Sequence, residues 1–148
     1  MLEFRQIEPA DFERVFDIWH SSVLATHDFL SDADRAEIAT QVKDLYIPNT
    51  PLILGVLESV IVGFMGMTDN HIDALFIDPD HLGQGIGKAF IQYARTITKG
   101  SLSVDVNEQN EGARRFYEKM GFAVTSRTET DSGGRPYPIL YLLSLIHI

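Results

Sequence analysis

The sequence predicts a mixed α/β fold of the α+β type, in which the elements follow the order β-α-α-β-β-β-α-β-α-β-β around a central mixed sheet. Three β-rich runs, PLILGVLE, VIVGFMGMT and HIDALFIDP, are separated only by short turns. Because parallel neighbours need a long crossover, these runs can pair only as antiparallel hairpins. A strand, a glycine-rich loop, a helix and another strand then follow over residues 71–106, which allows one parallel pair in the same sheet.

The first third of the chain supplies one strand and two helices. Residues 2–7 alternate apolar and polar side chains, as a half-buried strand does. Pro9 suits the first position of a helix that runs to about residue 25. Ser31 and Asp34 resemble a capping box at the beginning of a second helix, and Pro48 is expected to end it. The expected apolar stripes are Phe12, Val15, Phe16, Trp19 and Val23 on the first helix, and Ile38, Val42, Leu45 and Tyr46 on the second.

The last part of the chain supplies two further helices and three strands. A third helix follows the glycines, with Gly100 just past its end. The run SLSVDV is reached through this helix, so we expect it to lie parallel to the preceding strand. Asn110 is suited to cap a fourth helix. FAVTSRTET and YPILYLLSL predict a final hairpin around residues 132–136. The third helix is expected to bury Ile86, Ala89, Phe90, Tyr93, Ala94 and Ile97.

Length and composition predict one globular, cytoplasmic domain over residues 1–148. Hydrophobic residues make up 45% of the chain and charged residues 22%, and no apolar run reaches the ~20 residues that span a bilayer. The opening residues MLEFRQIEPADF lack the basic and then apolar pattern of a secretion signal. We find no repeat or linker, and we assign no role to the final residues, IHI.

Charge and the missing cysteines exclude several classes of partner. The net charge of −9 argues against nucleic acid, because binding to phosphate backbones needs a field of Lys and Arg. Two interpretations of this charge stay open, a solvated acidic surface and attraction of a cationic partner. With no cysteine, and no HxxxH or HExxH spacing among the five histidines, we expect no metal and no disulfide. The oligomeric state stays open between monomer and homodimer.

The segment DHLGQGIGKAF, residues 80–90, carries glycines at three alternate positions, Gly83, Gly85 and Gly87, between a strand and a helix. Glycines at this junction let a phosphate group approach the backbone N–H groups of a helix N-terminus. A glycine-rich turn without a ligand is the other interpretation of the segment.

Two known classes of phosphate loop do not fit this segment. A P-loop would need glycine at position 82 and Ser or Thr at 89, where the chain has Leu82 and Ala89. A dinucleotide loop that began at Gly83 would need glycine at position 88, which is Lys88. Asp105 stands about where a ribose-binding acid would, but a dinucleotide-binding domain would be parallel throughout.

Two motifs resemble the GNAT acetyltransferases. LGQGIG, residues 82–87, is similar to the acyl-CoA loop Q/R-x-x-G-x-G/A of that family, with Leu82 in place of the usual Arg or Gln. NEGARRFYEKMGF, residues 110–122, resembles the family segment N-x-x-A-x-x-x-Y-x-x-x-G-F. The resemblance extends over essentially the whole chain, because ATHDFLSDADR, HIDALFIDPD, VNEQN, FYEKMGF and GRPYPIL look like the YjaB-type bacterial members, known as protein lysine N-acetyltransferases.

The resemblance implies an acetyl-CoA-dependent N-acetyltransferase that acetylates a protein lysine or a small cationic amine. Since there is no cysteine nucleophile, transfer is expected to be direct within a ternary complex. In such enzymes the fourth and fifth strands splay, the fourth pairs with the pantetheine arm, and the loop binds the pyrophosphate. The implied cofactor-binding residues are Leu75, Phe76, Ile77, Gly83, Gln84, Gly85, Ile86, Gly87, Lys88, Asn107, Asn110, Ala113 and Phe116. Arg114 and Lys119 are either phosphate contacts or solvated helix charges.

The resemblance makes Tyr117 the general acid, because a phenol with a pKa of about 10 stays protonated at neutral pH and can protonate the leaving thiolate. A backbone N–H of the fourth strand would face the oxyanion. A core aromatic on an amphipathic helix is the other interpretation of Tyr117. His71 and Asp73 are candidates for the base, and ordinary structural roles are the alternative for both.

The acceptor amine is expected between the first two helices and the final hairpin. The candidate residues that would line this position are Trp19, His27, Asp28, Phe29 and Tyr137. Core packing is the alternative for Trp19, and local capping is the alternative for Asp28, whose short acid suits an ammonium group.

Two other classes of function remain to be weighed. A non-catalytic acyl-CoA sensor of the same fold would bind the cofactor and regulate a partner, and acceptor-dependent release of CoA thiol would distinguish it from an enzyme. A nucleotide-linked oxidoreductase is the third interpretation, and it predicts binding of NAD(P).

Overall fold

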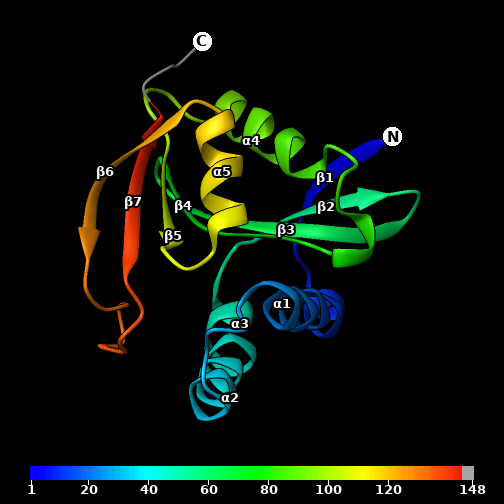
Figure 1. Ribbon diagram of the computed structural model, residues 1–148. Coiled ribbons are helices and arrows are strands. Elements are labelled where there is room, and N and C mark those ends of the chain that lie inside the picture. Colours follow the sequence, from blue (N-terminus) through cyan, green and yellow to red (C-terminus); the bar gives the residue numbers. More distant parts are fainter. Residues whose placement is uncertain (145–148) are drawn as a thin grey trace. The chain divides into compact units, whose positions relative to one another are not determined.

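The computed structural model describes residues 1–144, and its elements follow the predicted order, which confirms the fold class (Figure 1). The final IHI lies outside the described residues. The strands are β1 (Leu2–Gln6), β2 (Ile53–Leu57), β3 (Val60–Thr68), β4 (His71–Ile77), β5 (Ser103–Asn107), β6 (Phe122–Thr128) and β7 (Ile139–Ser144). The α-helices are α1 (Phe12–Thr26), α2 (Asp32–Gln41), α3 (Ile47–Asn49), α4 (Ile86–Ile97) and α5 (Glu111–Lys119). The short helices η1 (Pro9–Asp11) and η3 (Pro79–His81) are 3-10 turns, and η2 (Val42–Tyr46) is a π-helix.

The strands form a mixed sheet in the order β1-β2-β3-β4-β5-β7-β6. The pairs β1–β2, β2–β3, β5–β7 and β6–β7 are antiparallel. The predicted parallel pair is confirmed, because His71 of β4 lies opposite Ser103 of β5 and Ile72 lies opposite Val104.

The chain divides into two compact units. The first unit contains residues 1–66 and 74–90, and the second contains residues 67–73 and those from 91 onward. Strand β4 and helix α4 each contribute residues to both units. The assignment of residues 1–148 to a single domain stays a prediction.

The core of the first unit follows from the alternation of side chains along β2 and β3. Leu54 and Phe64 lie opposite each other in register and are buried, together with Val15 and Ile18 of α1 and Ile47 of α3. Because successive side chains of a strand point to opposite faces, the residues next to this pair face the other way. Helices α1 and α3 thus cover one face of β2 and β3 (Figure 1).

On the opposite face, two glycines make room for one aromatic ring. Gly55 and Gly63 lie opposite each other in β2 and β3. A Cβ atom added at Gly55 would lie 2.8 Å from Cζ of Phe90, and one added at Gly63 would lie 3.1 Å from Cε2 of the same ring. Phe90 is fully buried and meets Phe4 of β1 edge to face, with ring centroids 5.0 Å apart. This contact fixes the first turn of α4 on the sheet of the first unit.

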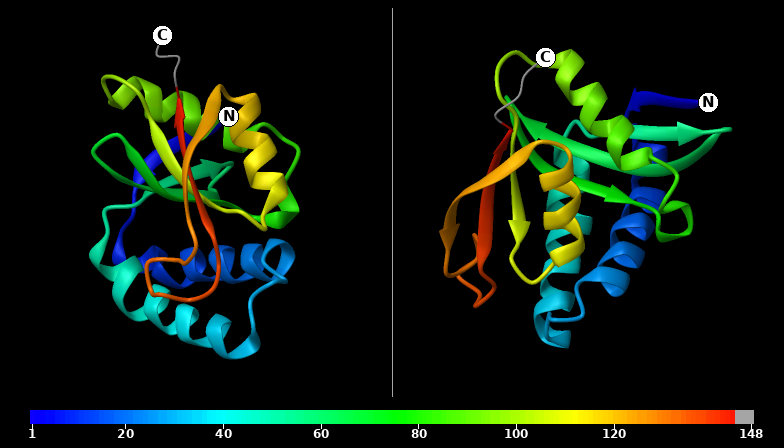
Figure 2. Two further views of the ribbon diagram at one scale, coloured as in Figure 1. Left: turned by 60° about the vertical axis from the view of Figure 1, so that its left-hand side comes forward. Right: turned by 45° about the horizontal axis from the view of Figure 1, so that its top comes forward.

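The second unit buries one face of its strands against α5 and the later part of α4. Figure 2 shows β6 beside β7 and β7 beside β5. The ring of Tyr117 in α5 meets that of Phe122 in β6 edge to face at 5.4 Å. Arg95 of α4 donates a hydrogen bond of 2.7 Å to the backbone oxygen of Met120, which joins α4 to the end of α5. Buried apolar residues of this unit are Ile72, Ile91, Ala94, Leu102, Val104, Val106, Tyr117, Phe122, Tyr137, Leu140 and Leu142.

The predicted end of the second helix was wrong. Ser31 caps α2 as expected, because its Oγ accepts a hydrogen bond of 3.1 Å from the Asp34 backbone. The chain then continues through the π-helix η2 into α3, and Pro48 stands in the first turn of α3, where a proline needs no N–H partner. The wider turn of a π-helix also breaks the predicted apolar stripe. Leu45, expected in the core, is 64% exposed.

The stripe predicted for α4 was partly wrong. Ile86, Phe90 and Ala94 are buried as expected, but Ile97 is half exposed because it is the last residue of the helix. Ile91, which was not in the predicted stripe, is fully buried instead.

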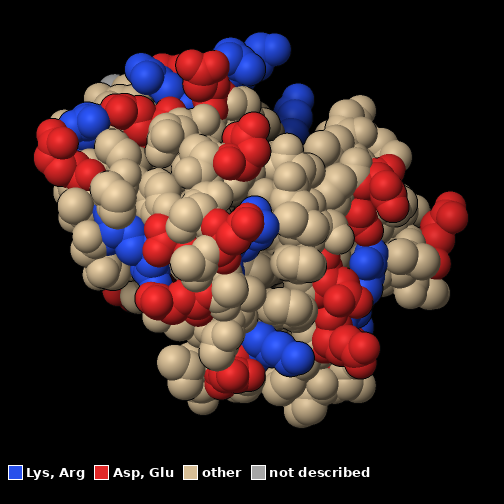
Figure 3. All heavy atoms as spheres, turned by 60° about the horizontal axis from the view of Figure 1, so that its bottom comes forward, with Lys and Arg blue, Asp and Glu red and all other residues tan. Residues whose placement is uncertain are grey.

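Acidic and basic side chains are interspersed on the face that Figure 3 shows. Ion pairs of the first unit include Arg5 with Asp11 at 2.8 Å and Arg35 with Asp32 at 2.7 Å. Within residues 1–144, no helix is both long and apolar enough to cross a membrane.

Candidate active site

The glycine loop belongs to the first unit and leads directly into α4. Gly83 and Gly85 adopt φ angles of 78° and 76°, a left-handed backbone conformation that favours glycine. No side-chain or backbone atom lies within 4 Å of the position that a Cβ would take at either residue. The loop is therefore open, with Ile86 buried where the helix begins. Free N–H groups at the beginning of a helix of this length form an anion-binding site.

The strand before this loop is anchored through its backbone. Leu75, Phe76 and Ile77 are half-buried. The ring of Phe76 stacks on Phe64 of the core, with centroids 5.4 Å apart. The backbone oxygen of Ile77 accepts a hydrogen bond of 2.9 Å from the hydroxyl of Ser22 in α1. These contacts place the C-terminal end of β4 firmly in the first unit.

Asp78, which directly follows β4, was not a candidate from the sequence. It is 8% exposed and forms an ion pair of 2.6 Å with Arg14 of α1. Burial alone would raise the pKa of Asp78, but hydrogen bonds from the Asp80 backbone and from Arg14 lower it overall. Asp78 therefore carries a buried negative charge at the beginning of the loop segment.

The histidine at the end of α1 has a defined tautomer. The Thr26 hydroxyl donates its one proton to the backbone oxygen of Ser22 at 2.7 Å. Thr26 Oγ1 also lies 2.7 Å from Nδ1 of His27, and with the Thr26 proton given to Ser22 this nitrogen is assigned as the donor. The neutral His27 ring consequently carries its proton on Nδ1 and a lone pair on Nε2. Burial lowers the pKa of His27, against a smaller opposing effect of Asp28, so the neutral form prevails at pH 7.

The other acceptor candidates of the first unit differ in their surroundings. Trp19 is 5% exposed and stacks on Phe16, which agrees with core packing. Phe29 lies 5.2 Å from His27 between ring centroids, and Asp28 is exposed beside them. The side-chain cap of α2 is Ser31, and so the capping interpretation of Asp28 lacks support.

Tyr117 in the second unit is a buried phenol. The residue is 6% exposed, and its ring packs between Phe116 and Phe122. Burial raises the pKa of its hydroxyl above the ordinary value, which keeps the group protonated. Within residues 1–144 no hydrogen bond of this hydroxyl is seen, and its oxygen is not among the fully buried polar atoms that lack a partner.

The turn before α5 is well defined. The backbone N–H of Asn110 donates to the backbone oxygen of Asn107 at 2.9 Å. Asn110 caps α5 as predicted, because its Oδ1 accepts from the backbone of Ala113 at 3.2 Å. Arg114 lies 3.6 Å from Glu118, which favours the solvated helix charge for this arginine.

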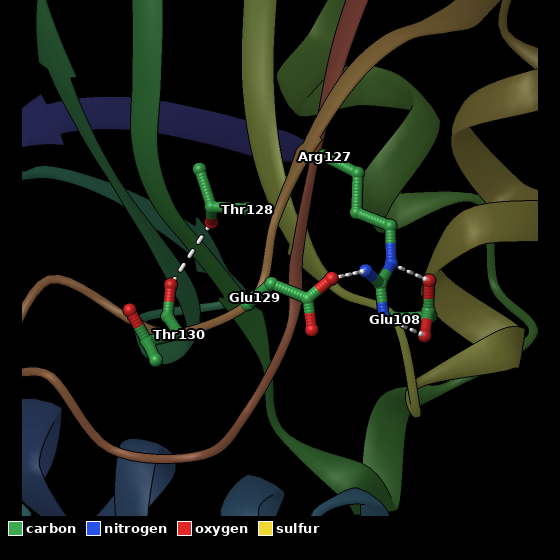
Figure 4. Close-up of polar contacts among 5 residues, drawn as sticks. All are labelled: Glu108, Arg127, Thr128, Glu129 and Thr130. Atoms are coloured by element: carbon green, nitrogen blue, oxygen red, sulfur yellow. Dashed lines mark hydrogen bonds and ion pairs between the residues drawn. The ribbon is translucent and has the colours of Figure 1, made fainter.

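A second arginine braces the same turn from β6. Figure 4 shows Arg127 between Glu108 and Glu129. Its Nε and Nη2 donate to the two carboxylate oxygens of Glu108 at 2.5 and 3.1 Å, and its Nη1 donates to Glu129 at 2.8 Å. The charge of Arg127 lowers the pKa of Glu108 through this hydrogen bond. All three groups are exposed to solvent, so the pair contributes little to stability.

The two predicted bases are both engaged by neighbours in the second unit. His71 Nδ1 lies 2.7 Å from Ser103 Oγ, and its Nε2 lies 3.3 Å from Asp105 Oδ2. Asp73 is exposed and accepts a hydrogen bond of 2.7 Å from the Thr68 hydroxyl. Their catalytic role stays a prediction.

Tyr137 follows a tight turn between β6 and β7. Asp131 accepts hydrogen bonds of 2.9 and 2.8 Å from the backbones of Gly133 and Arg135. The Tyr137 backbone donates to Arg135 at 2.8 Å, and its side chain is 8% exposed. The turn is thus fixed by its own contacts.

The candidate residues form two groups, one in each unit. The first unit holds the glycine loop, the end of β4 and the cluster around His27, while the second holds Tyr117, the two asparagines, His71 and Tyr137. Among residues 1–144 no group of His, Asp and Glu side chains is arranged to hold a metal ion. Sequence reasoning missed Arg14, Asp78, Ser22 and Thr26. Only Asp78 had a local signal, since Asp before Pro often initiates a turn.

The comparisons with known proteins agree with the two motifs. The family model described as acetyltransferase (GNAT) domain matches residues 27–138. A peptidyl-lysine N-acetyltransferase, YjaB of Salmonella typhimurium, is 49% identical over 144 residues, which cover 97% of this chain and 98% of that protein.

Two solved structures extend these comparisons. The solution structure of apo-form YjaB from Escherichia coli is similar with a TM-score of 0.93 and 42% identity, and covers 98% of both chains. An N-acetyltransferase from Thermoplasma acidophilum in complex with coenzyme A shares the fold, with a TM-score of 0.76, 20% identity, and coverage of 95% of this chain and 98% of that one.

Proposed function

The chain belongs to the GNAT acetyltransferase family, and on this premise we propose that it transfers an acetyl group from acetyl-CoA to the side-chain amine of a lysine in a protein or peptide. It is an N-acetyltransferase by family, and the acceptor is the part that is proposed. The observation that carries the acceptor is the likeness, over almost the full length of both chains, to a relative named a peptidyl-lysine N-acetyltransferase. We further propose that it acts in the cytoplasm, as a monomer or homodimer.

The acceptor is tested with a panel of amines and acetyl-CoA, read by release of free CoA thiol. Lysine-containing peptides are expected to release thiol faster than the same peptides with arginine at the lysine position. Acetylation of the peptide is then located by mass spectrometry. Thiol release with small amines but with no lysine peptide would contradict the proposed acceptor while leaving the enzyme class intact.

For the cosubstrate we propose that backbone N–H groups of the glycine loop bind the pyrophosphate of CoA, with Gly83, Gln84, Gly85, Ile86, Gly87 and Lys88 in the implied set. The open backbone of Gly83 and Gly85 at the beginning of α4 supports this role, as does the coenzyme A in the Thermoplasma neighbour. Leu82 stands where the family usually has Arg or Gln, and it is 59% exposed. Because it carries no charge, the backbone N–H groups must supply the attraction for the pyrophosphate. Leu75, Phe76 and Ile77 would pair with pantetheine, and Asn107, Asn110, Ala113 and Phe116 would contact it.

Coenzyme A is expected to raise the unfolding temperature, because a ligand that binds only the folded state stabilises it, by about 2.7 kcal/mol at a concentration of 100 Kd. Gly85→Val is expected to abolish this shift, since a β-branched residue disfavours the positive φ of the loop. Gly134→Val is the matched control: Gly134 has a φ of 78° and an equally open Cβ position, but it lies in the turn between β6 and β7. Both variants are compared by thermal unfolding with and without coenzyme A, and an unchanged shift in folded Gly85→Val would contradict the loop assignment.

The proposed reaction forms one bond and breaks one. The neutral amine attacks the thioester carbonyl, a C–N bond forms, and the oxyanion is held by a backbone N–H of β4. Collapse of this intermediate breaks the C–S bond, the thiolate takes the proton of Tyr117, and the phenolate so formed regains a proton from solvent. The proton lost by the amine passes to a base, directly or through water.

For this base we propose His27 ahead of His71 and Asp73. The lone pair on His27 Nε2 follows from the chain of hydrogen bonds from His27 to Thr26 to Ser22. By contrast, both ring nitrogens of His71 already contact Ser103 and Asp105. His27 also stands beside Phe29 and Asp28, and the Asp28 carboxylate is proposed to receive the ammonium group. Trp19 and Tyr137 stay proposed acceptor-binding residues of their own units.

The pH dependence tests this base. Because burial lowers the pKa of His27 from 6.5, the contribution of this base to kcat/KM is expected to be constant above about pH 6.5 and to fall as the pH drops through the lowered value. The acceptor lysine titrates near 10.4, so its limb of the profile is separate. His27→Gln should remove the acidic limb and lower kcat, whereas His71→Gln, the control, should keep the limb. If the acidic limb persists in His27→Gln, the base lies elsewhere.

A further inference from the structure

We infer that Arg14 of α1 positions the glycine loop by neutralising and holding Asp78, and this inference rests on the proposed function of the loop. Arg14 itself is a positioning residue, because it lies on α1 and contacts the residue before the loop segment.

Asp78 is tied into the first unit by every polar group that it has. Its backbone N–H donates to the Val62 backbone oxygen at 2.8 Å, and its backbone oxygen accepts from His81 at 2.8 Å. Carboxylate Oδ1 accepts from the Asp80 backbone at 3.0 Å, which caps η3. Carboxylate Oδ2 accepts from Arg14 at 2.6 Å. The direction in which the chain leaves β4 is set at this one residue.

Helix α1 reaches this point through two side chains. The same Nη2 of Arg14 that binds Asp78 also donates to the backbone oxygen of Ile61 at 2.8 Å. Eight positions further along, Ser22 donates to the backbone oxygen of Ile77. Arg14 therefore links α1, the beginning of β3 and the end of β4, and the loop starts from that junction.

Apart from Asp78 and η3, few contacts fix residues 82–85 of the loop. Leu82, Gly83, Gln84 and Gly85 are all exposed, and the Cβ positions of the two glycines meet no atom within 4 Å. The contacts that fix the loop lie at its ends, with Asp78 and η3 before it and the buried Ile86 and Phe90 after it. A loop held open in its binding conformation loses less entropy when the ligand binds.

The negative charge of Asp78 also supports a role for Arg14 in binding at the loop. Asp78 is a buried carboxylate five positions before Gly83, in a segment proposed to bind an anionic pyrophosphate. Without Arg14 this carboxylate would lose its ion-pair partner and keep only the hydrogen bond from the Asp80 backbone. Removal of one partner of such a pair is costly, although less so here than in a fully buried pair, because the Arg14 side chain is 38% exposed. Arg14 thus removes a repulsive charge as well as fixing the chain.

The test compares the affinity for coenzyme A in four variants, measured by calorimetry. Arg14→Met keeps the aliphatic stem and removes the charge, and it is expected to raise Kd for coenzyme A about tenfold. KM for acetyl-CoA should rise in parallel while kcat at saturation stays within about twofold, because Arg14 touches no reacting atom. Arg14→Lys should lie between Arg14→Met and the wild type. Arg5→Met is the matched control, since Arg5 forms an ion pair of 2.8 Å with Asp11 in the same unit but away from the loop, and its Kd should not change.

The double variant Arg14→Met with Asp78→Asn separates the two effects. If the unpaired charge is the cause, the double variant should bind coenzyme A more tightly than Arg14→Met alone. A folded Arg14→Met protein with the wild-type Kd would overturn the inference, as would a kcat loss without any change in KM. Should Arg14→Met fail to fold, Arg14→Gln, which also removes the charge, carries the same test, and a wild-type Kd there has the same meaning. Failure of the wild-type protein to bind coenzyme A would instead overturn the proposed function of the loop.

Discussion

Tyr117→Phe is expected to lower kcat by about 10²–10⁴-fold, because general acid catalysis typically contributes that much. The substitution keeps the ring, the edge-to-face contacts with Phe116 and Phe122, and the helix α5. It removes only the proton donor that we assign to the leaving thiolate. Water can replace part of this donation, so the lower end of the range is the expected value. The measurement is kcat at saturating acetyl-CoA with a lysine peptide.

The free energy of unfolding is the control measurement for Tyr117→Phe. Within the described residues no hydrogen bond of the Tyr117 hydroxyl is seen, so loss of the hydroxyl should leave the free energy of unfolding almost unchanged near pH 7. Because burial raises the pKa of Tyr117 in the folded state, its ionisation in the unfolded state should weaken the protein above pH ~10, and Tyr117→Phe should remove this loss. Tyr141→Phe, which removes a tyrosine hydroxyl but keeps the ring stacked on His71, should keep wild-type kcat. A folded Tyr117→Phe enzyme with wild-type kcat would leave Tyr117 as a core aromatic.

Phe90→Ala is expected to lower the free energy of unfolding by about 3–5 kcal/mol, the usual cost of removing a buried aromatic ring. Phe90 is fully buried, and its ring fills the space above Gly55 and Gly63, which have no side chains that could close the cavity. Since domains of this kind are stable by about 5–15 kcal/mol, the variant should lose a large part of its stability. The measurement is urea unfolding with the midpoint and slope fitted together.

The matched control for this variant is Phe16→Ala. Phe16 is an aromatic residue of the same unit that is only partly buried, so its loss should cost clearly less. Coenzyme A affinity should fall in Phe90→Ala and hold in Phe16→Ala, because Phe90 packs α4 onto the sheet just after the loop, whereas Phe16 belongs to α1. A cost below about 1 kcal/mol for Phe90→Ala would mean that the cavity collapses or that the ring contributes little.

Local signals carried the fold and part of the site. The capping residues Ser31 and Asn110 were predicted from residue type and spacing, and both accept the expected hydrogen bond. The parallel pairing of β4 and β5 followed from the helix between them. Tyr117 became a candidate because its neighbours form a motif of fixed spacing, and the structure adds that the residue is buried.

Contacts between distant positions could not be predicted in this way. Arg14 and Asp78 are 64 positions apart, and although Asp before Pro indicates a turn at Asp78, nothing in the sequence pairs it with Arg14. The tautomer of His27 depends on a hydroxyl that also binds a helix carbonyl, which no pattern of residue types reveals. The π-helix that turned Leu45 outward is a change of one residue in helical register, and apolar spacing alone assumes a constant repeat.

The seating of Phe90 on the two glycines restricts the order in which these positions can evolve. At Gly55 the close atoms belong only to the Phe90 ring, with Leu2 at an ordinary 3.5 Å, so a smaller residue at position 90 would make the substitution Gly55→Ala acceptable. At Gly63 the added Cβ would also lie 2.9 Å from the backbone oxygen of Phe76, which no side-chain change can move aside. The two glycines therefore differ in epistasis. A side chain at position 55 can be accepted once a smaller residue has replaced Phe90. A side chain at position 63 is not accepted in either order of mutation.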